Sequence, residues 1–191
     1  MEITTFIVTG VIGIILLYAI VIYNGLVRLK HGMTKAWSNI DVLLKQRHDE
    51  LPKLVETCRR YMQYEQQTLD QVMKARAAVS SAGQRRDLGA LGTAEGELRL
   101  GLGNLFALAE AYPELKANET FRHLQERITG LEESIAHRRE FYNESVNINN
   151  VRIEQFPDMI LASLFKFGAG DLLEFADTEK TDVDVKALFA R

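Results

Sequence analysis

Histidine and cysteine, the residues that most often act as metal ligands and nucleophiles, are scarce in this chain. The single cysteine, Cys58, has no second cysteine with which to form a disulfide or a thiolate metal site. It falls on an apolar helical stripe, so we expect a small buried side chain rather than a redox sensor. The histidines lack the spacing of a shared metal site: His31, His48, His123 and His137.

Carboxylates could support a two-metal centre inside a helical bundle, but that chemistry uses Glu-x-x-His motifs on facing helices. Glu119, Glu126 and Glu133 are each followed, three residues later, by something other than histidine. Neither a glycine-rich phosphate loop nor a Gly-x-Ser-x-Gly nucleophile motif occurs. These patterns predict a protein that is not an enzyme and that uses no metal and no cofactor.

The densest polar stretch is HRREFYNESVNINN, residues 137–150, which interrupts an apolar helical seam. Continuing the seam through this stretch places Arg139, Tyr142 and Asn149 at seam positions. A buried arginine needs a partner, because an uncompensated buried charge is strongly destabilising. We therefore predict that Arg139 meets a carboxylate, with Glu65 as the candidate, or helix-end carbonyls, and that Asn149 fixes helix register. These four residues are predicted to form a structural polar lock.

The composition favours a helical globular chain that could position such residues. A length of 191 residues, with 47% apolar and 26% charged residues, suits one domain plus an appendage. The residue types that dominate are good helix formers. The net charge of −3 argues against a dedicated nucleic-acid binder, so no nucleic-acid partner is expected.

The first segment is predicted to be an uncleaved membrane anchor. The uncharged run from Ile3 to Tyr23 would be ~31 Å long as a helix, and a hydrocarbon core is ~30 Å thick. A cleaved signal peptide would need a basic start and a small-residue cleavage site, and neither is present. Arg28, Lys30 and Lys35 follow the run. The positive-inside rule therefore predicts a single-pass protein of the cell (inner) membrane, with its N-terminus outside and the bulk of the chain cytoplasmic.

Apolar residues beyond the anchor recur every three or four positions, which predicts helices rather than strands. Pro52 interrupts the first long run and either kinks that helix or breaks it. Residues 80–96 are expected to form a loop, because glycine, serine and charged residues replace the periodic pattern. Asn118 is expected to cap the last long helix, which should stop at the Phe156-Pro157 pair.

Three separated stretches of this sequence closely resemble the LemA family, and the likeness runs over residues 23–175. They are YNGLVRLKHGMTKAWSNIDVLLKQRHDELPKLVE, AEAYPELKANETFRHLQERITGLEESIAHRREFYNESVN and FPDMILASLFKF. The resemblance implies a single-pass, mostly helical bacterial membrane protein with a four-helix soluble part and no established enzymatic activity. It also implies an association of some members with magnetosome formation and of others with membrane proteases.

The expected fold is all-α: an N-terminal transmembrane helix followed by an elongated up-and-down four-helix bundle. The alternative is a long kinked helical hairpin, in which one helix runs through Pro52 to Ser80. Residues 1–25 are assigned to the anchor, 26–157 to the bundle, and 158–191 to an apolar segment and a polar tail.

The expected function is that of a membrane-anchored scaffold or adaptor that contacts the lipid bilayer and partner proteins. The alternative is a regulator or partner of a membrane-bound protease or another membrane enzyme. Homo-oligomers are also expected, because long exposed helices pair readily. The apolar segment would dock on a partner or touch the bilayer, or else fold back on the bundle, through these residues: Met159, Ile160, Leu161, Leu164, Phe165, Phe167, Leu172, Leu173 and Phe175.

Overall fold

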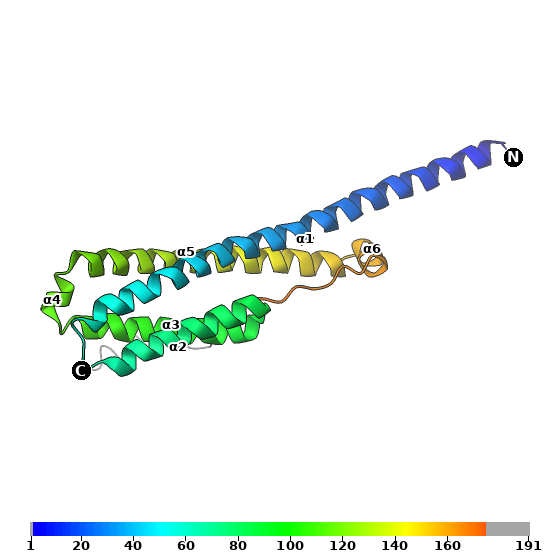
Figure 1. Cartoon of the computed structure of the whole chain (residues 1–191). Coiled ribbons are helices and arrows are strands. Elements are labelled where there is room, and N and C mark those ends of the chain that lie inside the picture. Colours follow the sequence, from blue (N-terminus) through cyan, green and yellow to red (C-terminus); the bar gives the residue numbers. More distant parts are fainter. Residues whose placement is uncertain (1, 175–191) are drawn as a thin grey trace, which may run out of the picture. The chain divides into compact units, whose positions relative to one another are not determined.

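The longest helix, α1, carries the apolar N-terminal run into the rest of the fold without a break. The computed structural model describes residues 2–174, and within them α1 covers Glu2–Arg59 (Figure 1). Pro52 lies inside α1, so it does not break the helix. The chain leaves α1 after Arg59, so the alternative of one kinked helix running to Ser80 is wrong. The described residues form helices and no strand, which confirms the all-α fold.

The chain divides into two compact units. The anchor unit comprises the chain up to Asp41 together with Ala136–Leu172. The bundle unit comprises Val42–Ile135 together with Leu173 and Glu174. Two helices, α1 and α5 (Glu119–Glu154), contribute to both units.

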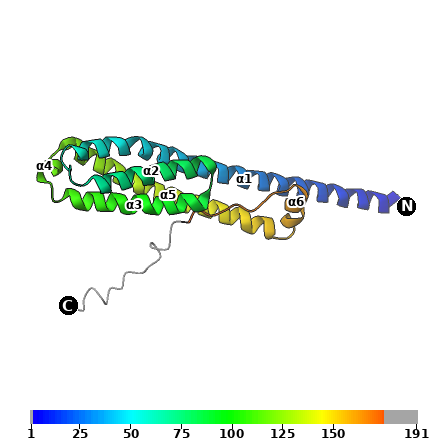
Figure 2. The ribbon, with the colours of Figure 1, turned by 60° about the horizontal axis from the view of Figure 1, so that its bottom comes forward.

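Four helical stretches pack together in the bundle unit (Figure 2). They are the end of α1, α2 (Gln66–Arg85), α3 (Leu88–Ala109) and the start of α5, with the short α4 (Pro113–Lys116) between α3 and α5. Short connections join consecutive helices, as in an up-and-down bundle. The core is apolar, and its fully buried side chains include Leu51, Leu54, Met62, Leu69, Leu91, Leu98, Leu105 and Leu115.

Helices α2 and α3 approach closely at one glycine. A Cβ atom added to Gly101 of α3 would lie 3.4 Å from the side chain of Val72 on α2. Gly101 is buried, so this contact belongs to the packed interior of the bundle unit. A glycine that weakens α3 intrinsically thereby allows tighter packing between two helices.

The glycine-rich stretch at residues 80–96, expected to be a loop, is almost entirely helical. Only Arg86 and Asp87 separate α2 from α3. Arg86 takes the left-handed conformation, with φ 53°, and the Asp87 carboxylate caps α3 by accepting a hydrogen bond from the Ala90 amide at 3.0 Å. The loop prediction was wrong because small residues such as Gly92 are buried in helix packing rather than used in a turn.

The last long helix begins and ends at the predicted residues. The Asn118 side-chain oxygen accepts a hydrogen bond from the Phe121 amide at 3.0 Å and so caps the first turn of α5. Helix α5 ends at Glu154, shortly before the Phe156-Pro157 pair. Both boundaries follow from local chemistry, which is why the sequence alone predicts them.

In the anchor unit, α6 (Asp158–Leu164) and the segment that follows it turn back beside α1 (Figures 1 and 2). We call residues 165–172 the return segment. Ile22 and Leu26 of α1 form a small buried cluster with Ala162 of α6. Other partly buried side chains pack against this cluster, namely Ile153, Leu161 and Phe167.

Candidate functional site

Arg47 of α1 is a buried charge inside the bundle unit. Its side chain is 1% exposed, and its guanidinium contacts the carboxylates of Glu95 on α3 and Glu132 on α5. Burial acts to lower the pKa of Arg47, but attraction by the two carboxylates outweighs burial and raises this pKa above its usual value. An arginine held protonated does not act as an acid or a base, so this cluster ties three helices together.

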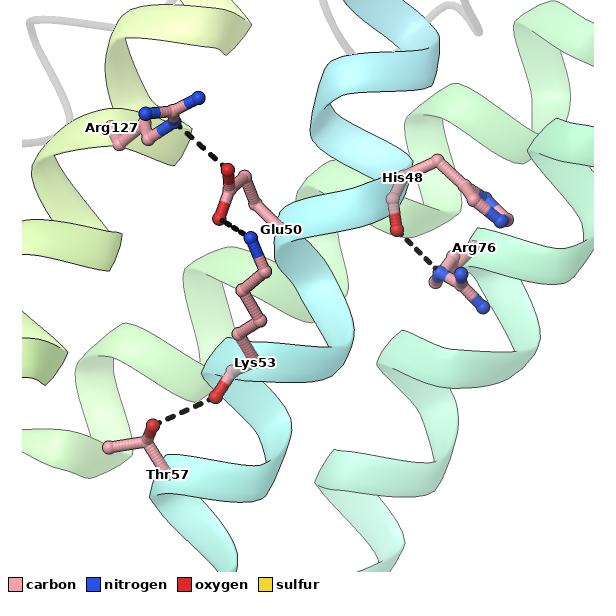
Figure 3. Close-up of polar contacts among 6 residues, drawn as sticks. All are labelled: His48, Glu50, Lys53, Thr57, Arg76 and Arg127. Atoms are coloured by element: carbon pink, nitrogen blue, oxygen red, sulfur yellow. Dashed lines mark hydrogen bonds and ion pairs between the residues drawn. The ribbon is translucent and has the colours of Figure 1, made fainter.

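Pro52 is accommodated inside α1 by a hydrogen bond from α2. Proline has no amide N–H, so the carbonyl of His48, four residues earlier, loses its usual helical donor. The Nε of Arg76 donates to that carbonyl at 2.8 Å (Figure 3). A guanidinium from a neighbouring helix thus replaces the amide that Pro52 cannot supply.

The same stretch of α1 is also tied to α5. The Glu50 carboxylate accepts a hydrogen bond from Lys53 Nζ at 3.0 Å and pairs with Arg127 Nε of α5 at 3.1 Å (Figure 3). Burial, and then repulsion by Arg76, lowers the pKa of His48. The Glu50 carboxylate is thus paired with two cations, one of which ties α1 to α5. The lowered pKa favours the neutral form of the His48 imidazole.

Cys58, the strongest nucleophile in the sequence, is fully buried in the bundle unit. Burial raises the pKa of the Cys58 thiol to about 12, so the thiol stays protonated at neutral pH. Within residues 2–174, no group of three His, Cys, Asp or Glu side chains lies close enough together to hold a metal ion.

Two residues of the predicted lock, Tyr142 and Asn149, lie in the anchor unit and hold the return segment. The Tyr142 hydroxyl donates to the carbonyl of Asp171 at 3.0 Å, and its ring packs edge-on against Trp37 with centroids 5.7 Å apart. The Asn149 side chain, which is 1% exposed, donates to the carbonyl of Gly168 at 3.2 Å. These contacts fasten the return segment to α5.

Asn150, which sequence reasoning left out, makes the closest contact with the return segment. Its side chain donates to the Gly170 carbonyl at 2.9 Å and accepts from the Gly170 amide at 2.8 Å. A Cβ atom on Gly170 would lie 3.2 Å from Met33 and 3.3 Å from Val146, so a glycine fits this narrow space. We call the hydrogen bonds of Tyr142, Asn149 and Asn150 to the return segment the clasp.

The other two predicted lock residues have different surroundings. Glu65 lies in the turn between α1 and α2, where the Tyr112 hydroxyl donates to its carboxylate at 3.4 Å. Arg139 is half-buried on α5. The pairing of Arg139 with Glu65 stays a prediction, and the fully buried arginine between two carboxylates is Arg47. The sequence does not predict a buried Arg47, because the polar run QRHDE in which it lies is typical of a solvent-exposed helix face.

The apolar segment after α5 folds partly against α1. Leu161 and Phe167 pack on the cluster of Ile22 and Leu26, and Leu173 is buried. The Phe165 and Phe167 rings contact Tyr23 of α1, with centroids 4.8 Å and 5.8 Å apart. The remaining described members of the segment are exposed: Met159, Ile160, Leu164 and Leu172. Phe175 lies outside the described residues.

The first part of α1, from Ile3 to Tyr23, is a single candidate membrane span by length and composition. Its apolar side chains are largely exposed, with Ile3 at 77% and Tyr23 at 38%. A long apolar run of this kind is typical of a helix that spans a membrane. Fold and site together define a class: an all-helical protein with one N-terminal candidate span and an ion-paired helical bundle.

Comparison with known proteins agrees with this class. The model of the LemA family matches residues 36–187, and the chain belongs to this family. It is 23% identical to the magnetosome protein MamQ 2 of Paramagnetospirillum magneticum, over 87% of this chain and 70% of the relative. It is 24% identical to the magnetosome protein MamQ of Magnetospirillum gryphiswaldense, over 76% of this chain and 62% of the relative.

Proposed function

We propose that this chain is a membrane-anchored helical scaffold without catalytic activity of its own. In this proposal the span lies in the cell (inner) membrane, the N-terminus lies outside, and the bundle unit is cytoplasmic. The supporting observation is the continuity of α1, which carries the candidate span and the first bundle helix as one element through Pro52. Arg47 and Arg76 hold the last part of α1 among the other helices of the bundle unit.

The polar contacts support a structural role. The charges of Arg47 and Glu50 are used in helix pairing, and the Cys58 thiol is buried and protonated. The relatives are named as magnetosome proteins, and this supports a role for the present chain as a component of a protein assembly. The partners of a scaffold would contact exposed side chains of the bundle unit, such as Tyr64 and Leu100.

Crosslinking in intact membranes, followed by mass spectrometry, tests the proposal. A photoreactive amino acid is placed at Tyr64, which is 94% exposed, or at Leu98, which is 1% exposed and serves as the matched buried control. A scaffold gives crosslinks to several proteins or to further copies of the chain from Tyr64 and none from Leu98. Stoichiometric recovery of a single membrane enzyme would support regulation of that enzyme instead. Substrate turnover by the purified chain, or equal crosslinking at both positions, would refute the proposal.

A further inference from the structure

Apolar side chains crowd the surface where the chain turns from α5 into the return segment. Five of them, within ten residues of sequence, are 48–79% exposed: Phe156, Met159, Ile160, Leu164 and Phe165. We call this set the apolar rim. Exposed apolar residues gathered in this way mark an interaction surface, because a water-facing surface rarely keeps so many together.

The rim lies beside the end of the candidate span. The opposite face of α6 packs through Ala162 on Ile22 and Leu26 of α1, and the Phe165 ring meets Tyr23. Tyr23 is the last residue of the uncharged run, so these contacts place the rim level with the end of the span (Figures 1 and 2). Aromatic rings are favoured at this depth, where hydrocarbon meets headgroups.

Charged residues of both signs flank the rim, and the exposed Glu154 lies two residues before Phe156. The one acidic residue of α6, Asp158, is 4% exposed and is paired with Arg152. Exposed cations stand nearby in sequence: Arg28 on α1, a few residues beyond Tyr23, and Lys166 at the end of α6. Phosphate headgroups favour cations and disfavour exposed carboxylates.

We propose that residues 156–167 form an interfacial element that inserts the apolar rim into the surface of the bilayer crossed by α1. The bilayer is the occupant that the position of the rim favours, since apolar residues at the end of a span meet lipid first. Such elements sit ~5–10 Å deep in the boundary between headgroups and acyl chains. The clasp fastens the return segment to α5 and so fixes the orientation of the rim relative to α5.

This inference rests on the proposed anchoring of α1, and spin labelling separates the two. The native thiol, Cys58, is 0% exposed, so a nitroxide reagent labels only an added exposed cysteine in the otherwise intact chain. Purified full-length protein is reconstituted in phosphatidylcholine–phosphatidylglycerol vesicles. Collision of the label with lipid-soluble oxygen is then compared with its collision with a water-soluble nickel chelate. Unsubstituted protein, which should give no signal, checks that Cys58 stays unlabelled.

Three labelled variants carry the test. Phe156→Cys reports on the rim, and Ile15→Cys reports on the span. Phe141→Cys is the matched control, because Phe141 is an exposed phenylalanine on α5 about 20 Å of helix before its end. We expect the oxygen-to-nickel ratio at the rim to exceed that at Phe141 several-fold and to approach that at Ile15.

Each other outcome overturns the inference in a distinguishable way. If the rim label meets nickel as freely as the Phe141 label while the Ile15 label is lipid-exposed, anchoring stands and the interfacial element fails. If the rim label is shielded from both reagents, the rim is covered by a second copy of the chain instead of lipid. If the Ile15 label meets nickel freely, anchoring and the interfacial element fail together. The same comparison at Leu164→Cys guards against a local effect of one substitution.

Discussion

Replacing Arg76 by methionine should reveal what allows a proline to lie inside α1. The substitution keeps much of the aliphatic side chain but removes the Nε that donates to the His48 carbonyl at 2.8 Å. A hydrogen bond from a charged donor contributes ~1.5–3 kcal/mol, and the half-buried position of Arg76 favours the lower end. We therefore expect Arg76→Met to lower the free energy of unfolding by ~1.5 kcal/mol.

Removing the proline should make Arg76 largely dispensable. Alanine at position 52 restores an amide that can donate to the His48 carbonyl, so this carbonyl no longer depends on α2. Pro52→Ala should raise the free energy of unfolding by less than the ~3 kcal/mol that a proline costs in a helix interior, because Arg76 already satisfies the freed carbonyl. In the Pro52→Ala background, Arg76→Met should cost ~0.5 kcal/mol or less, a coupling of ~1 kcal/mol.

Urea unfolding of the full chain in mild detergent, followed by circular dichroism, measures the four corners of this cycle. Working near pH 8, above the ordinary His48 pKa of 6.5, keeps the imidazole neutral in every variant, so repulsion by Arg76 does not contribute. Lys74→Met, an exposed cation on the same helix, is the matched control and should stay within ~0.5 kcal/mol of the unsubstituted protein. Equal costs of Arg76→Met in both backgrounds would refute the reasoning.

Three further predictions concern the other polar contacts. Glu95→Gln should lower the free energy of unfolding by ~1–3 kcal/mol, since it removes one of the two carboxylates from the buried Arg47 and leaves Glu132; unaltered urea unfolding would contradict this. The pKa of His48 is lowered by folding, so the unfolded chain binds the proton more readily, and stability should fall as pH drops below about 6.5. His48→Gln should flatten that part of the pH profile of thermal unfolding, and an identical slope would count against His48. Asn150→Ala removes both hydrogen bonds to Gly170, so amide exchange in the return segment should quicken several-fold; unchanged protection would show that the clasp does not depend on Asn150.

Features with a short-range cause were the ones that sequence reasoning predicted well. Asn118 caps α5, and the Phe156-Pro157 pair follows its end, because both depend on bonds within one turn of helix. Residues 80–96 were misread for the opposite reason. Their glycines look like loop residues, but helix packing in the bundle unit uses small residues such as Gly92, which is buried in α3.

The predicted lock shows the same division. Tyr142 and Asn149 were selected because they continue the helical seam, and each side chain has a hydrogen-bond partner in the return segment. Which partners they meet depends on where the chain returns after α6, and no periodicity in the sequence encodes that path. Asn149 was predicted to fix the register of a helix seam, and its side chain donates a hydrogen bond to the return segment.

The sequence by itself determined the properties that sum along a few turns of chain. An uncharged run of helix-spanning length, apolar residues at steps of three and four, and the family motifs were sufficient for a candidate span, an all-α fold and the LemA family. Only the tertiary structure decided which charges are buried, because a buried arginine and a solvated one look alike in a helical sequence. The setting of Arg47 between Glu95 and Glu132, and the pairing of Arg76 with the carbonyl freed by Pro52, depend on helices distant in sequence. Such contacts arise when packing removes polar groups from water and each group must find a new partner.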